Sequence, residues 1–338
     1  MLVSGVVLPV APRRIWANEV SSGSECEQAD DESLVIERDA VEVAPRHGVS
    51  LRTVEIENRL GDVTIIGRDE KGLSISVTKR AADEETLERL KVNLQPDPAG
   101  SVRISSVVLF GEEARPIPLG AARIDITVSL PREAKVSVKV WNGAVSVSGL
   151  SRGATLLAND ADITVTDVKG PVATSNLRGR QRLIAVSGDV AADNAHGDLA
   201  LDEISGQSLA ARAHDGTVVA TRVRSRRVEI RTTFGSILFQ GELLAGGRYD
   251  LRSYRGNVEA RLPRDTAFVI SASSRDGTVA SRLDLRDAQS QRVGEGLSSV
   301  AGYYGPAHGS RLGPVERRPA VIVITSVVGT VTVGLVNE

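Results

Sequence analysis

The chain has 338 residues and a formal net charge of −2, and this balance speaks against a nucleic-acid binder, which would carry a basic stripe with stacking aromatics. Hydrophobic residues make up 41% of the chain, which is enough to build the core of one or two domains. The single cysteine, Cys26, excludes an intramolecular disulfide and a cysteine metal cluster.

Residues 1–33 are expected to form an N-terminal tail. The apolar residues 1–10 are about half as long as a membrane span requires, so we expect no transmembrane segment. Residues 11–17 fit either the end of a degenerate or truncated secretion signal, with cleavage near Ala17, or part of a disordered tail. The polar, acidic stretch 21–33 indicates a linker.

Residues 34–140 are predicted to be a β-rich region that caps one end of the fold. Residues 54–66 have the strand, turn and strand of a single structural unit, and residues 73–77 continue the alternation of apolar and polar positions. The open end of a stack of strands exposes unpaired edges, so a cap would prevent end-to-end association.

One helix is expected in this region, at about residues 83–92. Asp83 is the expected N-cap, and Leu87, Leu90 and Leu94 would share one apolar face. Acidic residues near the start of this segment and basic residues near its end suit the helix dipole.

Residues 141–284 repeat with a period of 18 to 21 residues. Each repeat carries a tight-turn marker, and the markers are Gly143, Ala161, Gly179, Gly197, Gly216, Gly235, Gly256 and Gly277. Apolar residues lie two and four positions after each marker, and most repeats have another such pair seven and five positions before the next one. This period of two predicts two short strands per repeat, each with one buried face.

Strands that recur at a fixed spacing can bury their apolar faces by stacking on their equivalents in the next repeat. We therefore predict an all-β fold, a β-solenoid in which each repeat forms one rung of a two-sheet parallel β-helix-like stack, with one short capping α-helix. The column two residues after the markers is predicted to lie inside: Val145, Ile163, Gln181, Leu199, Val218, Ile237, Val258 and Val279. Gln181 breaks this column, so either it forms hydrogen bonds inside the stack or its rung is out of register. Small residues before the markers, as at Ala158, Ala213, Thr232 and Ser253, would fit a narrow interior.

Residues 285–319 interrupt the period with a polar, Gly-rich insertion. Its Tyr303 and Tyr304 are expected either to contact a partner or to pack the insertion against the stack. Residues 320–338 restore the strand, turn and strand pattern, and we expect them to form the last rung.

The chain resembles the bacterial putative-adhesin family of β-strand-repeat domains, and more loosely the head domains of auto-transporter adhesins. The resemblance rests on the segment 54–65, on the helix followed by the segment 124–131, and on the ladder of Asn-Gly, Ser-Gly-Asp-Val and Asp-Gly-Thr-Val turns. It covers roughly residues 34–338. It implies an envelope or secreted location and a binding role. It implies no catalytic residues, because the family has no agreed active site.

Arg212, Arg231 and Arg252 lie four residues before their markers on three successive repeats. If the rungs stack in register, these side chains form an outward ladder about 5 Å apart, and like charges at that spacing need neutralising. A polyanion such as an acidic glycan or a lipid phosphate would do so, because arginine binds carboxylate and phosphate in a bidentate way. The alternative is a solvated face that Glu229 and Asp250 neutralise.

His196 and His214 are candidate metal ligands, because they fall on neighbouring rungs near one corner with Asp198 and Asp215 beside them. The alternative is that they are exposed turn residues, and we expect no metal and no other cofactor. The nonapeptide repeat of calcium-binding β-rolls does not occur in the sequence.

No catalytic residues are predicted. A polysaccharide-cleaving β-helix enzyme would need a carboxylate pair on adjacent rungs of one face, whereas Asp162, Asp189 and Asp198 fall at corners. The scarcity of tryptophan and tyrosine also removes the usual platform on which sugars stack.

The sequence therefore favours a non-enzymatic structural or adhesive module of the bacterial cell envelope, located in the periplasm, in the envelope or outside the cell. The expected partner is a polyanionic glycan or another protein rather than a nucleic acid, and the oligomeric state is left open. Two alternatives are a polysaccharide-binding or polysaccharide-cleaving β-helix protein, and a cytoplasmic scaffold or polymer-forming protein.

Overall fold

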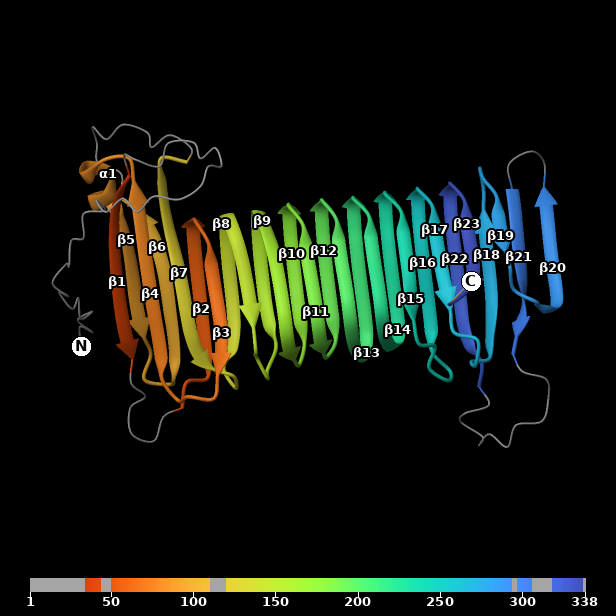
Figure 1. Cartoon of the computed structure of the whole chain (residues 1–338), viewed down its shortest axis with the longest axis horizontal. Coiled ribbons are helices and arrows are strands. Elements are labelled where there is room, and N and C mark those ends of the chain that lie inside the picture. Colours follow the sequence, from red (N-terminus) through yellow and green to blue (C-terminus); the bar gives the residue numbers. More distant parts are fainter. Residues whose placement is uncertain (1–33, 44–49, 110–119, 294–296, 306–317, 337–338) are drawn as a thin grey trace, which may run out of the picture. The chain divides into compact units, whose positions relative to one another are not determined.

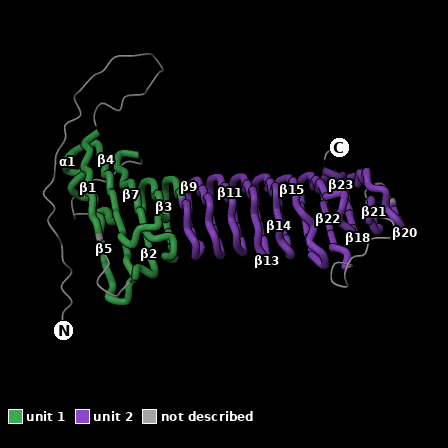
Figure 2. The backbone as a smooth tube through the Cα atoms, turned by 60° about the horizontal axis from the view of Figure 1, so that its bottom comes forward, with its two compact units in different colours: residues 1–146 green, residues 147–338 purple. Residues whose placement is uncertain are grey.

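The computed structural model describes residues 34–43, 50–109, 120–293, 297–305 and 318–336, and the expected tail, residues 1–33, lies outside them. Within this part of the chain there are 23 strands and one helix, so the all-β prediction is confirmed. The chain divides into two compact units, residues 1–146 and 147–338 (Figure 2). Among the described residues, no helix has the length and hydropathy that a membrane span requires.

Unit 1 is built from two layers of strands. Its strands are β1 (Val35–Val43), β2 (Thr53–Leu60), β3 (Val63–Arg68), β4 (Leu73–Ala81), β5 (Leu90–Pro96), β6 (Ser101–Val108), β7 (Ala122–Pro131) and β8 (Lys135–Ser148), whose last two residues enter unit 2. One layer has the order β1, β4, β7, β3, and the other has the order β5, β6, β2, β8 (Figure 1). Alternate residues of most of these strands are buried between the layers.

The strands β2 and β3 form the rung expected at residues 54–66. β2 pairs in parallel with β6 on one side and with β8 on the other, and β3 pairs in parallel with β7. Beyond this rung the pairing becomes antiparallel, between β7 and β4, between β4 and β1, and between β6 and β5. Antiparallel strands thus cover the outer edges of β6 and β7 within unit 1.

The helix α1 spans Glu84–Arg89 and is shorter than the expected 83–92. Asp83 is its N-cap, as predicted, and its carboxylate accepts the N–H of Thr86 at 2.6 Å, which lowers the pKa of Asp83. The helix ends early because Leu90 is extended, fully buried and already part of β5, which pairs with β6. A six-residue helix has little stability of its own, so the backbone hydrogen bonds of the sheet decide the boundary.

Unit 2 consists of stacked rungs, which confirms the two-sheet solenoid. Its remaining strands are β9 (Ala154–Lys169), β10 (Val172–Arg178), β11 (Gln181–Ser187), β12 (Val190–His196), β13 (Leu199–Asp215), β14 (Val218–Phe234), β15 (Ile237–Gly241), β16 (Arg248–Arg255), β17 (Val258–Leu262), β18 (Phe268–Ser274), β19 (Val279–Ser281), β20 (Arg286–Val293), β21 (Leu297–Tyr304), β22 (Ala320–Val328) and β23 (Val331–Leu335). Equivalent strands of successive rungs lie side by side in parallel (Figure 1).

Each rung contributes one strand segment to each of two sheets. The first sheet contains the segments that directly follow a marker, and the second sheet contains those that precede the next marker. Long strands such as β13 and β14 bend at the corner between the sheets, at Glu203 (φ 55°) and Arg222 (φ 50°). Ala185 (φ 54°) and Asp167 (φ 52°) occupy the same corner on earlier rungs, so residues other than Gly, Asn and Asp also adopt the left-handed conformation here.

The interior column predicted from the repeat is confirmed from Ile163 to Val258, whereas Val279 is only partly buried and is separated from Val258 by Val331. Consecutive partners in register are Ile163, Gln181, Leu199, Val218, Ile237 and Val258, each at most 1% exposed. Gln181 keeps this register, and it forms hydrogen bonds inside the stack. Its Oε1 accepts the hydroxyl of Thr174 at 2.6 Å, and its Nε2 donates to the carbonyl of Asp193 at 2.7 Å.

The marker glycines lie directly against the marker of the preceding rung. A Cβ atom on Gly197 would be 2.2 Å from the carbonyl oxygen of Gly179, and its φ of +129° is in the region that favours glycine. The same close approach to the preceding marker recurs at Gly216, Gly235 and Gly256. Both the backbone conformation and the lack of space therefore select glycine at most markers.

A buried polar column runs through unit 2 three residues before the markers. Asn194 Nδ2 donates to the carbonyls of Gly179 and Gly197, both at 2.9 Å. Asn176, Thr232, Ser253 and Ser326 also donate to a marker carbonyl, and Ser274 donates to the carbonyl of Gly329, the turn glycine between β22 and β23. The polar residues here do more than fit a narrow interior, because they satisfy turn carbonyls that water does not reach.

Residues 320–338 do form a rung, yet it is not the last one in space, contrary to the sequence prediction. The strand β22 pairs in parallel with β16 on one side and with β18 on the other, and β23 lies between β17 and β19. The rung formed by β22 and β23, the last in the sequence, is therefore inserted between the rung of β16 and β17 and the rung of β18 and β19. In this position both edges of the apolar strand β22 are hydrogen-bonded, whereas at the end of the stack one edge would be left unpaired.

The insertion at 285–319 contains an antiparallel pair of strands, β20 and β21, and β21 also pairs antiparallel with β18. The ring of Tyr304 stacks on that of Phe268, with the ring centroids 4.8 Å apart, so this tyrosine packs the insertion against the stack. The pairing of β20 is irregular near Asp287, whose φ is 49°. Such a bulge makes the edge of β20 a poor template for another strand.

Candidate functional site

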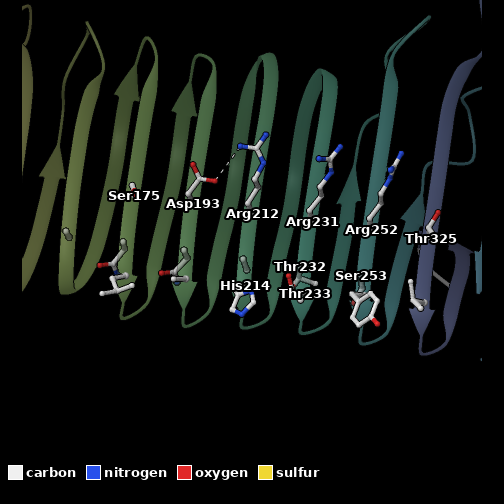
Figure 3. Close-up of a pocket in the computed structure, with 18 of the residues that line it drawn as sticks. Ser175, Asp193, Arg212, His214, Arg231, Thr232, Thr233, Arg252, Ser253 and Thr325 are labelled. Carbon is white, nitrogen blue, oxygen red and sulfur yellow. Dashed lines mark ion pairs between the residues drawn. The ribbon is translucent and has the colours of Figure 1, made fainter. Parts of the chain in front are cut away.

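Three arginines form one outward column on the second sheet. The register of β13, β14 and β16 aligns Arg212 with Arg231 and Arg231 with Arg252, and the column continues to Asp193 on one side and Thr325 on the other. Figure 3 shows the three guanidinium groups on adjacent strands and pointing in the same direction. About half of each arginine side chain is exposed, so the column is open to a ligand.

Carboxylates partly neutralise this column. Glu229 Oε1 lies 3.3 Å from both Arg212 and Arg231, and Asp250 Oδ1 lies 2.6 Å from Arg252 Nε. Arg212 also pairs with Asp193 at 3.7 Å (Figure 3). A guanidinium has five N–H donors, and these acids approach only one or two nitrogens of each arginine, so donors remain for an external anion.

The surrounding face carries net positive charge although the chain as a whole is negative. A second arginine column, Arg227 beside Arg248, lies on β14 and β16 beyond Glu229 and Asp250. The twelve outward positions of the second-sheet segments of β13, β14 and β16 hold five arginines, one glutamate and one aspartate, a formal charge of +3 with neutral histidine. We call these twelve positions the arginine face. They are residues 208, 210, 212, 214, 227, 229, 231, 233, 248, 250, 252 and 254.

A groove runs along the arginine column and crosses the rungs. Its volume is about 820 Å³, and the three arginines form one side of it. The other side is formed by residues two positions further along each strand, in the order Leu177, Ala195, His214, Thr233, Tyr254 and Val327. Tyr254 is 51% exposed and Leu177 is 45% exposed, which gives this wall an accessible apolar surface.

Sequence reasoning found the arginine column and missed the wall opposite it. Residues two apart on a strand point to the same face, so Tyr254 follows Arg252 on the face that bears the arginines. His214 and Thr233 follow Arg212 and Arg231 in the same way. The signal was therefore present as the pattern Arg-x-His, Arg-x-Thr and Arg-x-Tyr on three successive repeats.

The two candidate metal ligands, His196 and His214, do lie near one corner. Their ring centroids are 6.1 Å apart in an edge-to-face arrangement, and the ring of His214 also meets that of Phe234 at 5.5 Å. His196 Nδ1 is 3.6 Å from a carboxylate oxygen of Asp215. In the described part of the chain, no three His, Cys, Asp or Glu side chains are grouped closely enough to hold a metal ion.

The corner aspartates hold the turn of the next rung. Asp162 Oδ1 accepts the backbone N–H of Arg180 at 2.8 Å, and Asp198 Oδ1 accepts that of Thr217 at 2.9 Å. Asp189 Oδ1 accepts two backbone N–H groups from the following rung, both at 2.9 Å. These three carboxylates are thus used to fix the backbone at the corners.

The stacked rungs, the glycine ladder and the outward arginine face define a β-solenoid repeat domain. Residues 51–302 match the family model of the Toastrack DUF4097 domain. The chain therefore belongs to the Toastrack DUF4097 family, a family of domains of unknown function. Among curated proteins, none matches the chain.

Three bacterial proteins of known structure match most of this chain. A "putative cell adhesion protein" from Clostridium sporogenes is 11% identical, with a TM-score of 0.26, and the match covers 89% of this chain and 99% of that one. A "putative lipid binding protein" from Parabacteroides distasonis is 10% identical, with a TM-score of 0.40 and coverages of 89% and 97%. A "putative adhesin" from the same organism is 14% identical, with a TM-score of 0.36 and coverages of 89% and 97%. Likeness at this level carries no functional argument.

Proposed function

We propose that this chain is a non-enzymatic binding module that holds an extended polyanion along the arginine face. The observation that carries the proposal is the in-register column of Arg212, Arg231 and Arg252, which lines a groove on a face with a formal charge of +3. Neighbouring strands are about 4.8 Å apart, so the three guanidinium groups repeat at that interval along the groove.

An external anion would complete the neutralisation that the internal acids begin. Like charges opposite each other on adjacent strands are destabilising, and Glu229 is shared between two arginines. A ligand with an anionic group at every rung would remove the remaining repulsion through bidentate hydrogen bonds. Binding of this kind is modest and salt-sensitive, because charges on an exposed face are screened over about 8–10 Å at physiological ionic strength.

The contacts of the acidic residues support the proposal that the module is not an enzyme. Hydrolysis of a glycan would need two carboxylates aimed at the scissile bond from one face. The corner carboxylates of Asp162, Asp189 and Asp198 accept backbone N–H groups instead, and Glu229 and Asp250 pair with the arginines.

We place the module in the bacterial periplasm or cell envelope, or outside the cell, on the resemblance of its turn ladder to adhesin-type repeat domains. Cell fractionation with an antibody against the chain tests this location. Recovery in the envelope or the medium is the expected result, and recovery in the cytosol alone would contradict it.

Retention on a sulfated-glycan column tests the binding site. The parent should be retained at low salt and eluted by added salt, and the triple variant Arg212→Gln, Arg231→Gln, Arg252→Gln should flow through. The matched control replaces Arg180, Arg222 and Arg261, three exposed and ion-paired arginines outside the arginine face, by glutamine. Equal loss of retention in both triple variants, or no retention of the parent, would refute the site.

A further inference from the structure

The groove has two chemically different sides that repeat together. On three successive rungs an arginine is followed, two residues later and on the same face, by a ring or a hydroxyl: Arg212 and His214, Arg231 and Thr233, Arg252 and Tyr254. Every repeat of the groove thus offers one cation and, roughly 7 Å away along the strand, one group suited to a ring face or a hydroxyl.

We infer that the polyanion is an acidic glycan whose carboxylates bind the arginine column while its sugar rings contact the wall of His214, Thr233 and Tyr254. This inference rests on the function proposed above and names its ligand class. A carboxylate takes two parallel N–H donors from a guanidinium, which suits Arg212, Arg231 and Arg252. The C–H face of a pyranose packs on an aromatic ring whose edge hydroxyl remains in water, as the half-exposed Tyr254 allows.

The wall opposite the arginines distinguishes this ligand from a simple phosphate polymer. A phosphate chain has no apolar face, so it would leave the exposed surfaces of Leu177 and Tyr254 in water and gain nothing from them. A sugar residue has both a polar edge and an apolar face, and it can use both sides of the groove at once.

The same wall disfavours the acyl chain of a lipid. The polar side chains of His214 and Thr233 interrupt the apolar residues on it. An acyl chain would desolvate these groups without offering hydrogen bonds in return. Sugar hydroxyls, in contrast, both donate and accept.

The test compares three probes by titration against the whole chain: oligogalacturonate, inorganic polyphosphate of similar length, and vesicles containing phosphatidylglycerol. We expect oligogalacturonate to bind most tightly. Tyr254→Ala should weaken oligogalacturonate binding about fivefold, the value expected for one lost ring contact, and should leave polyphosphate binding within about twofold. Tyr254→Phe, which keeps the ring, should bind oligogalacturonate like the parent.

The control is Trp141→Ala, which removes an exposed aromatic side chain of unit 1 and should change neither affinity. Tyr254 is half exposed, so its replacement should leave the melting temperature unchanged, which thermal unfolding verifies. If Tyr254→Ala weakens both polyanions equally, or if polyphosphate or the vesicles bind more tightly than oligogalacturonate, the glycan inference is overturned while the polyanion site stands. If no probe binds the parent, the inference and the proposed function both fail.

Discussion

At the scale of single residues, the stack is governed by contacts between backbones rather than by large side chains. The turn of each rung approaches the turn of the previous rung so closely that a methyl group does not fit, as Gly197 illustrates. The neighbouring buried position must then supply a hydrogen bond to the turn carbonyl, which Asn194 does. These two requirements explain why glycine and small polar residues recur along the repeat.

Replacing Gly197 by alanine should destabilise the chain by about 3 kcal/mol or more, because the new Cβ both strains φ and meets the carbonyl of Gly179. Urea unfolding followed by circular dichroism measures the effect. The control is Gly334→Ala in β23, where a Cβ would have nothing within 4 Å. Equal stability of the two variants would show that the rungs are not stacked as described.

We expect the stability of the fold to depend on pH through the buried hydroxyl of Tyr249. Burial raises the pKa of this hydroxyl, whose single proton is shared between the carbonyls of Ser225 and Glu242 and whose oxygen accepts the N–H of Leu244. Its folded-state pKa exceeds the unfolded value near 10, so the folded protein keeps a proton that the unfolded chain loses. The contribution to stability is therefore complete below about pH 10 and is lost as the pH rises through the folded-state pKa.

Melting temperatures between pH 8 and pH 11 check this prediction against Tyr249→Phe. The variant should be less stable at pH 8, since it lacks the hydroxyl, and its stability should fall less steeply above pH 10. Parallel curves for parent and variant would contradict the assignment.

Glu229 should limit the affinity for polyanions, because it is an internal counterion for both Arg212 and Arg231. Glu229→Gln raises the formal charge of the arginine face to +4 and should strengthen polyanion binding several-fold. The control, Glu259→Gln, makes the same change of charge beside Arg261 on the first sheet. An affinity no higher than that of the control would show that the arginines do not contact the ligand.

At the scale of elements, the repeat could be predicted from the sequence because it rests on local pattern. The period placed Ile163 through Val258 in one column, and the structure keeps that register. The helix end could not be predicted, since Leu90 satisfies the helical and the strand pattern equally and the partner strand β6 decides between them. The two hydrogen bonds of Gln181 depend on Thr174 and Asp193, a neighbourhood that appears only once the rungs are stacked.

The spatial order of the last rungs also could not be predicted from the sequence. By period alone, Arg248 and Val269 occupy the same column of consecutive rungs, 21 residues apart. The structure places Val321 between them, in register with both. Periodicity reports which residues are equivalent, and it does not report the order in which equivalent strands are added to the stack.

Pairs of engineered cysteines test this order directly. In a Cys26→Ser background, Arg248→Cys with Val321→Cys and Val269→Cys with Val321→Cys should each form a disulfide, because neighbouring strands are about 4.8 Å apart. Arg248→Cys with Val269→Cys should not, because two strand spacings exceed the reach of about 7 Å. A disulfide in the third pair and none in the first two would restore the sequential order.

At the scale of the whole molecule, a chain of net charge −2 gathers a formal charge of +3 on one face of one sheet. The arginine column of that face could be predicted, since it follows from the period. The opposite wall could not be identified from composition, because four tyrosines in 338 residues suggest no sugar platform. The structure shows that Tyr254 lines the same groove as Arg252. One tyrosine at this position can serve as a contact for a sugar ring even though tyrosine is rare in the chain.

The binding role of the arginine face is tested most directly by calorimetric titration of oligogalacturonate into the parent and into the Arg212→Gln, Arg231→Gln, Arg252→Gln variant, each at low and at high salt. We expect saturable binding to the parent that weakens as salt is raised, and an affinity at least about tenfold lower in the variant, the effect of losing a few exposed charge contacts. The triple control at Arg180, Arg222 and Arg261 should bind within about twofold of the parent. Equal affinities of the parent and of the Arg212→Gln, Arg231→Gln, Arg252→Gln variant, at the same salt, would show that the arginine face is not the binding site.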